Sequence, residues 1–328
     1  MTLDELIKAL EQTRGSRVLS YITGEKPPIF GTKIANDVIP LFKQILEKMP
    51  ANTEKISLFL NTSGGDLDAP WPIVNLIREY CKDFEVIIPE RALSAGTLIT
   101  LGADKIVMLP YSHLSPIDPA AEIIDVEKKQ QKRIEIEDII GYINFAKEKV
   151  GIKKQAVLGD VMKELGREIN PTMLGSANRA HSLIRSLGRN LLYLHNKKPT
   201  HGQIEQIIGY LSEGLFSHRH LINRKEAINT VGFSDIIEPA NPATKTAVDN
   251  LFNFYRDYLQ IEKDFDPSTI LGATDTVKDF KLPRALVQSL DIKFSFISNY
   301  HLTKTPSSPG INVPGINVNN NINKWEKI

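Results

Sequence analysis

Short apolar runs alternate with amphipathic stretches over the first third of the chain. The apolar runs lie at 18–22, 56–60, 86–88 and 106–108. Between them, helical periodicity is found at 33–48, at 69–81 and from about residue 94. Runs that are apolar at nearly every position are typical of strands buried on both faces, as in a parallel sheet covered by helices on each side. The pattern therefore predicts an α/β fold built on a parallel sheet.

The middle of the chain has a different pattern, with long polar stretches at helical spacing. It predicts helices at about 126–150, 155–165 and 172–196. In the last of these, leucines recur near one face, at positions 183, 187, 191 and 194. A further apolar run at 233–237 returns to the sheet, so we expect one domain over 1–240 that carries an inserted helical arm at about 125–196.

Beyond residue 240 the periodicity weakens. An amphipathic pattern at 249–262 predicts a helical extension over 241–302. The pentapeptide Pro-Gly-Ile-Asn-Val is repeated at 309–313 and 314–318, and three asparagines follow. Because Gly, Pro and Asn at this density interrupt regular elements, we expect a disordered tail over 303–328, although the repeats could also lie along a partner as an added strand.

Composition narrows the class of protein. Lys and Arg number 40 against 39 Asp and Glu, hydrophobic residues make up 41% and charged residues 24%. These values exclude a broadly basic nucleic-acid protein and an intrinsically disordered chain, so no nucleic-acid partner is expected. With Cys81 as the one cysteine, neither an intramolecular disulfide nor a cysteine zinc site can form. The sequence shows no apolar run typical of a signal peptide or a membrane span, and we expect a soluble, cytoplasmic protein.

Two loops that follow apolar strands carry the candidate chemistry. The loop at 61–66 contains Gly64 and Gly65, which can adopt positive φ and present N–H groups without a Cβ in the way. The loop at 90–97 places Ser94 at the start of a helix, where the N–H of Ala95 points toward a ligand. A serine at such a turn can act as a nucleophile, with these amides as oxyanion donors. The alternatives are that Ser94 is a helix N-cap and that the glycines form an ordinary turn.

Several motifs in this order resemble one known family. They are LFLNTSGGD at 58–66, ALSAGTLI at 92–99, GADKIVM at 102–108, LSPIDP at 114–119 and SHRHLI at 217–222. Together they resemble the serine dehydrogenase proteinase family, relatives of signal peptide peptidase A within the Clp-protease/crotonase fold. The resemblance implies a spiral βαβ core and a serine endopeptidase, with Ser94 as nucleophile and Gly64, Gly65 and Ala95 as the oxyanion hole. Ser63 stands where related proteases usually have proline.

The general base is the open part of this expectation. In the Clp proteolytic subunit a histidine stands where this chain reads 116–119, and there is no histidine in that stretch. Related enzymes use a lysine from the following helical region, which makes Lys132 a candidate, although the run at 128–133 also fits a solvated helix face or a phosphate-binding patch. His218, with His220 as its near neighbour, is favoured over Lys132 because that run is uniformly polar. The alternative for His218 is a surface or capping histidine.

The remaining signals concern ligands and partners. The other histidines show no metal-ligand spacing and no P-loop is present, so neither a metal nor a cofactor is predicted. We expect a peptide or protein substrate and a homo-oligomer formed through the arm. An ATPase or a membrane protein as partner is left open. Two other functions also remain open at this stage, a catalytically silent peptide-binding or scaffold protein and a crotonase-type acyl-CoA enzyme that uses carboxylates in place of serine.

Overall fold

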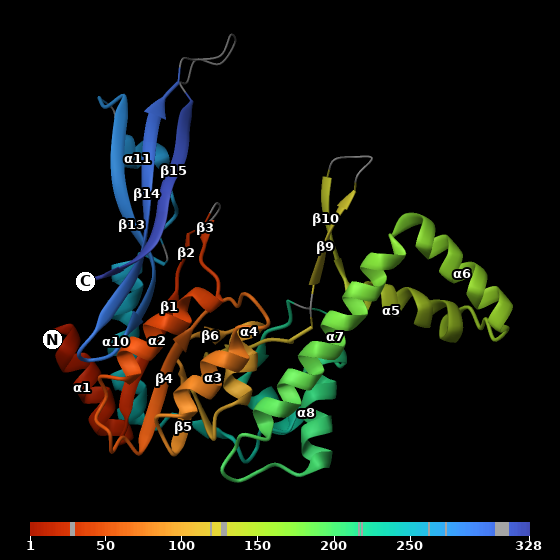
Figure 1. Cartoon of the computed structure of the whole chain (residues 1–328), viewed down its shortest axis with the longest axis horizontal. Helices are drawn as coiled ribbons and strands as arrows, with labels where there is room; N and C mark the ends of the chain where they lie inside the picture. The colour runs from red at the N-terminus through yellow and green to blue at the C-terminus, as the bar shows by residue number, and fades with distance from the viewer. Residues whose placement is uncertain are drawn as a thin grey trace.

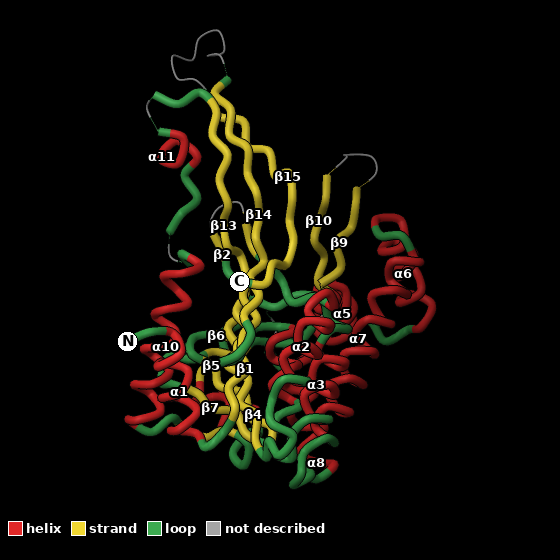
Figure 2. The backbone as a smooth tube through the Cα atoms, turned by 60° about the vertical axis from the view of Figure 1, so that its left-hand side comes forward, coloured by secondary structure: helices red, strands yellow, loops and turns green. Residues whose placement is uncertain are grey.

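A computed structural model of the chain describes residues 1–26, 30–118, 120–125, 130–215, 217, 219–261, 263–272, 274–305 and 315–328. A central sheet of eight strands separates two layers of helices, which Figure 2 shows nearly edge-on. The strand order is β12 (Ile237–Pro239), β7 (Lys105–Met108), β5 (Asp83–Ile88), β4 (Lys55–Asn61), β1 (Arg17–Thr23), β13 (Val277–Gln288), β14 (Lys293–Lys304) and β15 (Ile316–Lys327). The first five strands run parallel, and the last three are added antiparallel.

The two faces of the parallel strands have separate cores, because successive side chains of a strand point in opposite directions. In β4, Leu58 and Leu60 pack into one cluster and Phe59 into the other. The first cluster lies against α2 (Ile39–Leu46), α3 (Pro70–Arg78), α4 (Ala95–Leu101), α7 (Pro171–Leu192) and α8 (His201–Glu213). The second lies against α1 (Leu3–Arg14) and α10 (Pro242–Leu259). Figure 1 shows these helices on either side of the sheet, and the predicted α/β fold with a parallel sheet is confirmed.

Smaller elements complete the fold. A second sheet consists of β6 (Arg91–Ala92), β8 (His113–Leu114) and β11 (Ile222–Asn223), and β2 (Glu25–Lys26) pairs with β3 (Phe30–Gly31). The short helical segments are η1 (Asn36–Val38), η2 (Phe145–Lys149), α9 (Arg224–Glu226), η3 (Ala227–Val231) and α11 (Pro267–Leu271). Among the described residues, no helix combines the length and apolar character needed to cross a membrane.

The inserted arm differs in part from its prediction. The helix expected at 126–150 is wrong for residues 130–135, because β10 (Gln130–Glu135) pairs there with β9 (Ala120–Asp125) as an antiparallel hairpin and α5 (Ile136–Asn144) begins only afterwards. Polar residues such as those at 130–133 suit a helix or a strand, and pairing with β9 decides for the strand. The predicted second and third helices correspond to α6 (Gln155–Glu168) and α7. Figure 1 shows the hairpin and the pair α5 and α6 projecting from the core.

The C-terminal region is also more ordered than its sequence suggests. The segment expected to be a helical extension contains α10 and α11 but also β13 and β14, and part of the expected tail forms β15. Three long strands thus extend the sheet from β1 (Figure 1), and Ser20 of β1 pairs with Gln288 of β13. In β14 the apolar residues Phe294, Phe296, Tyr300 and Leu302 recur with the period of a strand, a signal that the expectation of a helical extension missed. The first pentapeptide repeat lies outside the described residues.

Candidate active site

The two loops singled out in the sequence meet at the carboxyl ends of β4 and β5. After β4, the N–H of Thr62 donates to the carbonyl of Arg91 (3.0 Å), and the N–H of Leu93 donates to the carbonyl of Thr62 (3.1 Å). These two bonds join the glycine loop to the serine loop as a short parallel bridge. The small sheet formed by β6, β8 and β11 therefore holds the candidate site beside the main sheet.

Both glycines are required by close backbone contacts. Gly64 has φ of 104°, and a Cβ there would lie 2.8 Å from the carbonyl oxygen of Leu93 and 2.9 Å from Cβ of Ser94. A Cβ at Gly65 would lie 2.1 Å from the carbonyl oxygen of Ile34. A side chain at position 64 would push the loop away from Ser94, and one at position 65 would collide with the backbone of Ile34. The interpretation of the pair as an ordinary turn therefore does not account for these two close contacts.

Ser94 occupies a strained backbone position immediately before α4. Its φ of 50° and ψ of −112° fall in a region that L-residues rarely adopt. Its side chain makes no hydrogen bond to the first turn of the helix, so Ser94 does not act as a side-chain N-cap. Strain of this kind persists only where neighbouring structure imposes it, and it is found preferentially at functional sites.

Ser115 is the neighbour that holds this backbone in place, and it was not among the candidate site residues expected from the sequence. Its buried hydroxyl accepts a hydrogen bond from the N–H of Ser94 (2.8 Å) and donates one to the carbonyl of Pro116 (2.9 Å). Its own N–H donates to Oγ1 of Thr97 (3.1 Å), and that hydroxyl donates to the carbonyl of Ala92 (2.8 Å). The network connects the end of β8 to both ends of the turn that carries Ser94.

The three amides proposed for the oxyanion hole are not equivalent. The N–H of Gly64 already donates to Oγ1 of Thr62 (3.0 Å). The hydrogen bonds found among the described residues leave the N–H groups of Gly65 and Ala95 unused. The amide nitrogen of Ala95 lies 3.5 Å from the place that a Gly64 Cβ would occupy, so the helix start and the glycine loop are in contact. Two free donors therefore remain, one from each loop.

Ser94 lines a cavity of about 490 Å³ together with Gly64, Gly65 and Ser115. This volume falls in the range of sites that bind small molecules or short peptide segments. Four charged residues also line it, Glu25, Lys33, Asp66 and Arg219. Glu25 is paired with Arg91 at 3.4 Å. The candidate nucleophile Ser94 thus faces an open, charged cavity and not the apolar core.

Comparison with known proteins identifies the family. A sequence model of the ClpP-like SDH-type serine proteinases matches residues 1–164, which is half of the chain and includes both loops. The chain belongs to this family. The resemblance noted in the sequence is therefore confirmed, and with it a fold of the Clp-protease type.

Individual relatives add little about activity. An uncharacterized protein of Methanocaldococcus jannaschii is 29% identical over 149 residues, covering 41% of this chain and 49% of the relative. A second uncharacterized protein of the same organism is 32% identical over 119 residues, covering 35% and 42%. The chain thus matches less than half the length of these curated relatives. Among solved structures, a ClpP1 mutant from Listeria monocytogenes is similar over 72% of this chain and 99% of its own, with a TM-score of 0.37 and 16% identity.

A ClpP-like serine proteinase needs a base near its serine. The structure describes some of the candidates expected from the sequence and not others. His218 lies outside the described residues. His220 is described, and its Nε2 pairs with Oε1 of Glu226 at 2.8 Å, an oxygen to which the hydroxyl of Tyr210 also donates (3.0 Å). The backbone of Lys132 belongs to the projecting hairpin, opposite Ile123, and its side chain lies outside the described residues.

Described residues on either side of position 218 lie near the two candidate loops. Ile222 pairs with Leu114 in the small sheet, immediately before Ser115. On one side of position 218, Arg219 lines the cavity of Ser94. On the other side, Ser217 lines a small neighbouring cavity together with Asp118.

Asp118 is a candidate that sequence reasoning missed. Its side chain is only 3% exposed, although an aspartate is seldom buried without a structural or functional reason. It lies between two prolines, in the stretch where the Clp subunit has its histidine. A carboxylate flanked by prolines soon after a strand was the signal that could have identified it. Among the residues that the structure describes, no group of three or more His, Cys, Asp or Glu side chains is placed to hold a metal ion.

Proposed function

We propose that the protein is a serine endopeptidase in which Ser94 is the nucleophile. The observation that carries this proposal is the strained turn at Ser94, whose side chain is not used for capping and whose neighbours Gly65 and Ala95 offer two free N–H groups. Acyl transfer needs both an exposed hydroxyl and preorganised donors for the oxyanion. The charged cavity in front of Ser94 supports an extended peptide as the substrate.

The chemistry then follows the usual course of a serine peptidase. Oγ of Ser94 attacks the carbonyl carbon of the scissile peptide bond and gives its proton to the base. The negative oxygen of the tetrahedral intermediate accepts hydrogen bonds from the N–H groups of Gly65 and Ala95. The base returns the proton to the leaving amine, and a water molecule, deprotonated by the same base, hydrolyses the acyl-enzyme.

We propose His218 as this base and Asp118 as the residue that orients it. Support comes from the described neighbours of position 218, because Arg219 lines the Ser94 cavity and Ser217 lines the cavity of Asp118. A buried carboxylate next to the base would fix the imidazole tautomer and stabilise the imidazolium that forms during attack. His220 is a weaker candidate because Glu226 already engages its Nε2.

A fluorophosphonate probe, which forms a covalent bond to an activated serine Oγ with loss of fluoride, tests the nucleophile. Wild-type protein should be labelled once, and Ser94→Ala should not be labelled. Ser63→Ala is the matched control, because Ser63 lines the same cavity and should not affect labelling. Labelling that persists in Ser94→Ala would refute the assignment. Wild-type protein that neither labels nor hydrolyses unstructured peptides would favour a catalytically silent peptide-binding protein.

The base is tested by comparing three single variants. His218→Ala should slow labelling about 10²–10⁴-fold, the contribution expected of general-base catalysis, and the wild-type rate should rise with pH through the imidazole range near 6.5. His220→Ala is the matched control and should label at nearly the wild-type rate. A severe loss in Lys132→Ala, with a mild effect of His218→Ala, would instead identify the lysine as the base.

The arm is proposed to form contacts between subunits. Its helices expose large apolar side chains, among them Tyr142 (43% exposed), Phe145 (58%), Met162 (44%) and Leu183 (49%). Apolar groups at this density on a projecting element are typical of an interface with another chain. Because the Clp-type fold is commonly oligomeric, we propose a second copy of this chain as the partner.

A further inference from the structure

The three strands β13, β14 and β15, which we call the strand extension, contact the main chain beside the proposed oxyanion hole. The contact is made by residues 32–37, which we call the connecting segment and which run from β3 into η1. Figure 1 shows β2 and β3 beside the lower part of the strand extension. On its other side, the connecting segment pairs with the glycine loop at Gly65. It therefore joins the strand extension to the candidate active site.

Thr32 attaches one end of the connecting segment to β13. Its Oγ1 accepts a hydrogen bond from the N–H of Gly24 (3.0 Å) and donates one to the carbonyl of Arg284 (2.8 Å). The N–H of Gly24 donates to the same carbonyl (2.8 Å). A Cβ at Gly24 would lie 2.7 Å from this carbonyl oxygen, so the two backbones are in direct contact.

Trp325 of β15 attaches the other end of the connecting segment. Its Nε1 donates a hydrogen bond to Oδ2 of Asp37 (2.9 Å). The indole itself is held by Phe296 of β14, with 5.3 Å between the ring centroids, and by the first core cluster. The carboxylate of Asp37 is therefore bound to a side chain whose own position is fixed by packing.

The part of the chain between these attachments has little packing to hold it. Residues 31–33 line the cavity of Ser94 and also a further cavity of about 320 Å³, which Arg284, Phe296 and Trp325 line from the strand extension. A segment that borders a cavity loses packing contacts on that side. The position of the connecting segment therefore depends on the hydrogen bonds at its ends.

Ile34 lies between the two attachments and orients a peptide group of the glycine loop. Its N–H donates to the carbonyl of Gly64 (2.9 Å), and its carbonyl accepts from the N–H of Asp66 (2.8 Å). The carbonyl of Gly64 and the N–H of Gly65 belong to one planar trans peptide group, so they point in opposite directions. The bond from Ile34 thus turns the N–H of Gly65 away from the connecting segment. Without that bond, a peptide group between two glycines would rotate at little steric cost.

We propose that the strand extension keeps the oxyanion hole formed by holding the connecting segment at both ends. Thr32 and Trp325 are positioning residues, since they act on the reaction only through the peptide group that Ile34 orients. When either attachment is lost, the N–H of Gly65 should lose the fixed direction in which it donates to the tetrahedral intermediate. This proposal rests on the peptidase function proposed above, because it concerns the same donor.

Two variants of the full chain test the proposal through the rate constant of fluorophosphonate labelling at saturating probe. Trp325→Phe keeps an aromatic ring but removes the donor to Asp37, and position 325 lies outside the lining of the Ser94 cavity. Thr32→Val keeps the size of the side chain but removes the hydroxyl. Each variant should lower the rate constant about threefold or more. In Trp325→Phe the probe concentration that gives half the maximal rate should stay that of the wild type. Thr32→Ser keeps the hydroxyl and should retain the wild-type rate.

Hydrogen–deuterium exchange gives a second measurement, which does not depend on chemistry at Ser94. The N–H groups of Ile34 and Asp66 are protected by the bonds that join the connecting segment to the glycine loop. Both should exchange faster in Trp325→Phe and in Thr32→Val than in the wild type.

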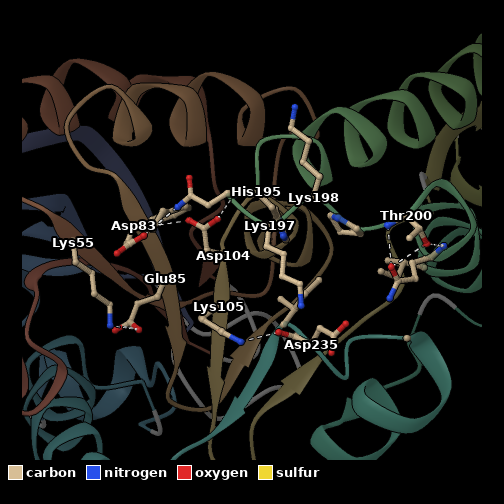
Figure 3. A pocket seen from close by; sticks show the side chains of 17 residues that line it. Lys55, Asp83, Glu85, Asp104, Lys105, His195, Lys197, Lys198, Thr200 and Asp235 are labelled. Atoms are coloured by element: carbon tan, nitrogen blue, oxygen red, sulfur yellow. Dashed lines mark hydrogen bonds and ion pairs between the residues drawn. The ribbon is translucent and has the colours of Figure 1, made fainter.

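Lys105→Met is the matched control. Nζ of Lys105 donates to the carbonyl of Asp235 (2.7 Å) in a cavity of about 460 Å³ at the amino ends of β4, β5 and β7 (Figure 3). The variant thus loses one hydrogen bond at the edge of the sheet opposite to Ser94. Its labelling rate and its exchange at Ile34 and Asp66 should be those of the wild type.

The outcomes separate this proposal from the proposed function. A wild type that is labelled, with an unchanged rate constant in either Trp325→Phe or Thr32→Val, would overturn this proposal alone. An equal loss in Lys105→Met would overturn it as well. So would a loss only in the final labelled fraction, because partial unfolding lowers that fraction without slowing the folded molecules. A wild type that is not labelled would instead refute the peptidase function, and this proposal with it.

Discussion

Replacing Ser94 by glycine should stabilise the protein relative to its replacement by alanine, while both changes abolish labelling. Ser94 adopts φ of 50° and ψ of −112°, which glycine tolerates and alanine does not. A residue held in such a region stores about 1–3 kcal/mol of strain. Glycine also gains about 0.4–1 kcal/mol of entropic advantage in the unfolded chain, which opposes this effect. The difference leaves Ser94→Gly more stable than Ser94→Ala by about 1 kcal/mol.

The comparison also separates strain from capping. Because the Ser94 side chain makes no capping bond, Ser94→Ala should keep nearly the stability of the wild type. A helix N-cap would instead lose about 0.5–2 kcal/mol on the same change. Urea unfolding followed by circular dichroism measures all three proteins under one condition. A glycine variant that is no more stable than the alanine variant would refute the strained conformation at the nucleophile.

Three further predictions concern the supports of the site and the fold. Ser115→Ala removes the acceptor for the Ser94 N–H and should slow probe labelling about tenfold or more by misplacing the nucleophile; an unchanged rate would exclude this positioning role. Glu85→Gln, which removes one charged partner of the buried Arg14 and leaves it paired with Glu238, should lower the free energy of unfolding by about 1.5–3 kcal/mol in urea. Burial raises the pKa of the Glu85 carboxyl, but hydrogen bonds, chiefly from Arg14, outweigh this and hold the pKa below its ordinary value. The ionised carboxylate therefore stabilises the fold fully at pH values above the pKa of Glu85 in the unfolded chain. As the pH is lowered through the pKa of Glu85 in the folded chain, the wild type should lose this stability, whereas Glu85→Gln should not. Phe145→Lys should shift the protein to a smaller species in sedimentation, and a wild-type monomer at micromolar concentration would contradict a subunit contact through the arm.

Parts of the site could be predicted because they depend on local chemistry. Two glycines in a row after an apolar strand indicate a backbone that must pass close to another, and at Gly64 and Gly65 the other backbone is that of Leu93 and Ile34. In the same way, its position between a strand and a helix identified Ser94 as the candidate nucleophile. The contact of Ser115 with the N–H of Ser94 and the burial of Asp118 were not predicted, because a hydroxyl or carboxylate has no sequence pattern that reveals its surroundings in the fold.

The sequence by itself determined the parallel core of this protein, since strands buried on both faces must be apolar at almost every position, as in β4 and β5. Its family followed from motifs along the same stretch. Only the tertiary structure decided the pairing of β9 with β10 and the addition of β13, β14 and β15 to the central sheet. A strand is stabilised by backbone hydrogen bonds to another segment, and the local residue pattern does not show which segment supplies them. The cavity at the amino ends of the strands was decided in the same way, because its walls come from segments more than a hundred residues apart that approach one another only in the folded chain.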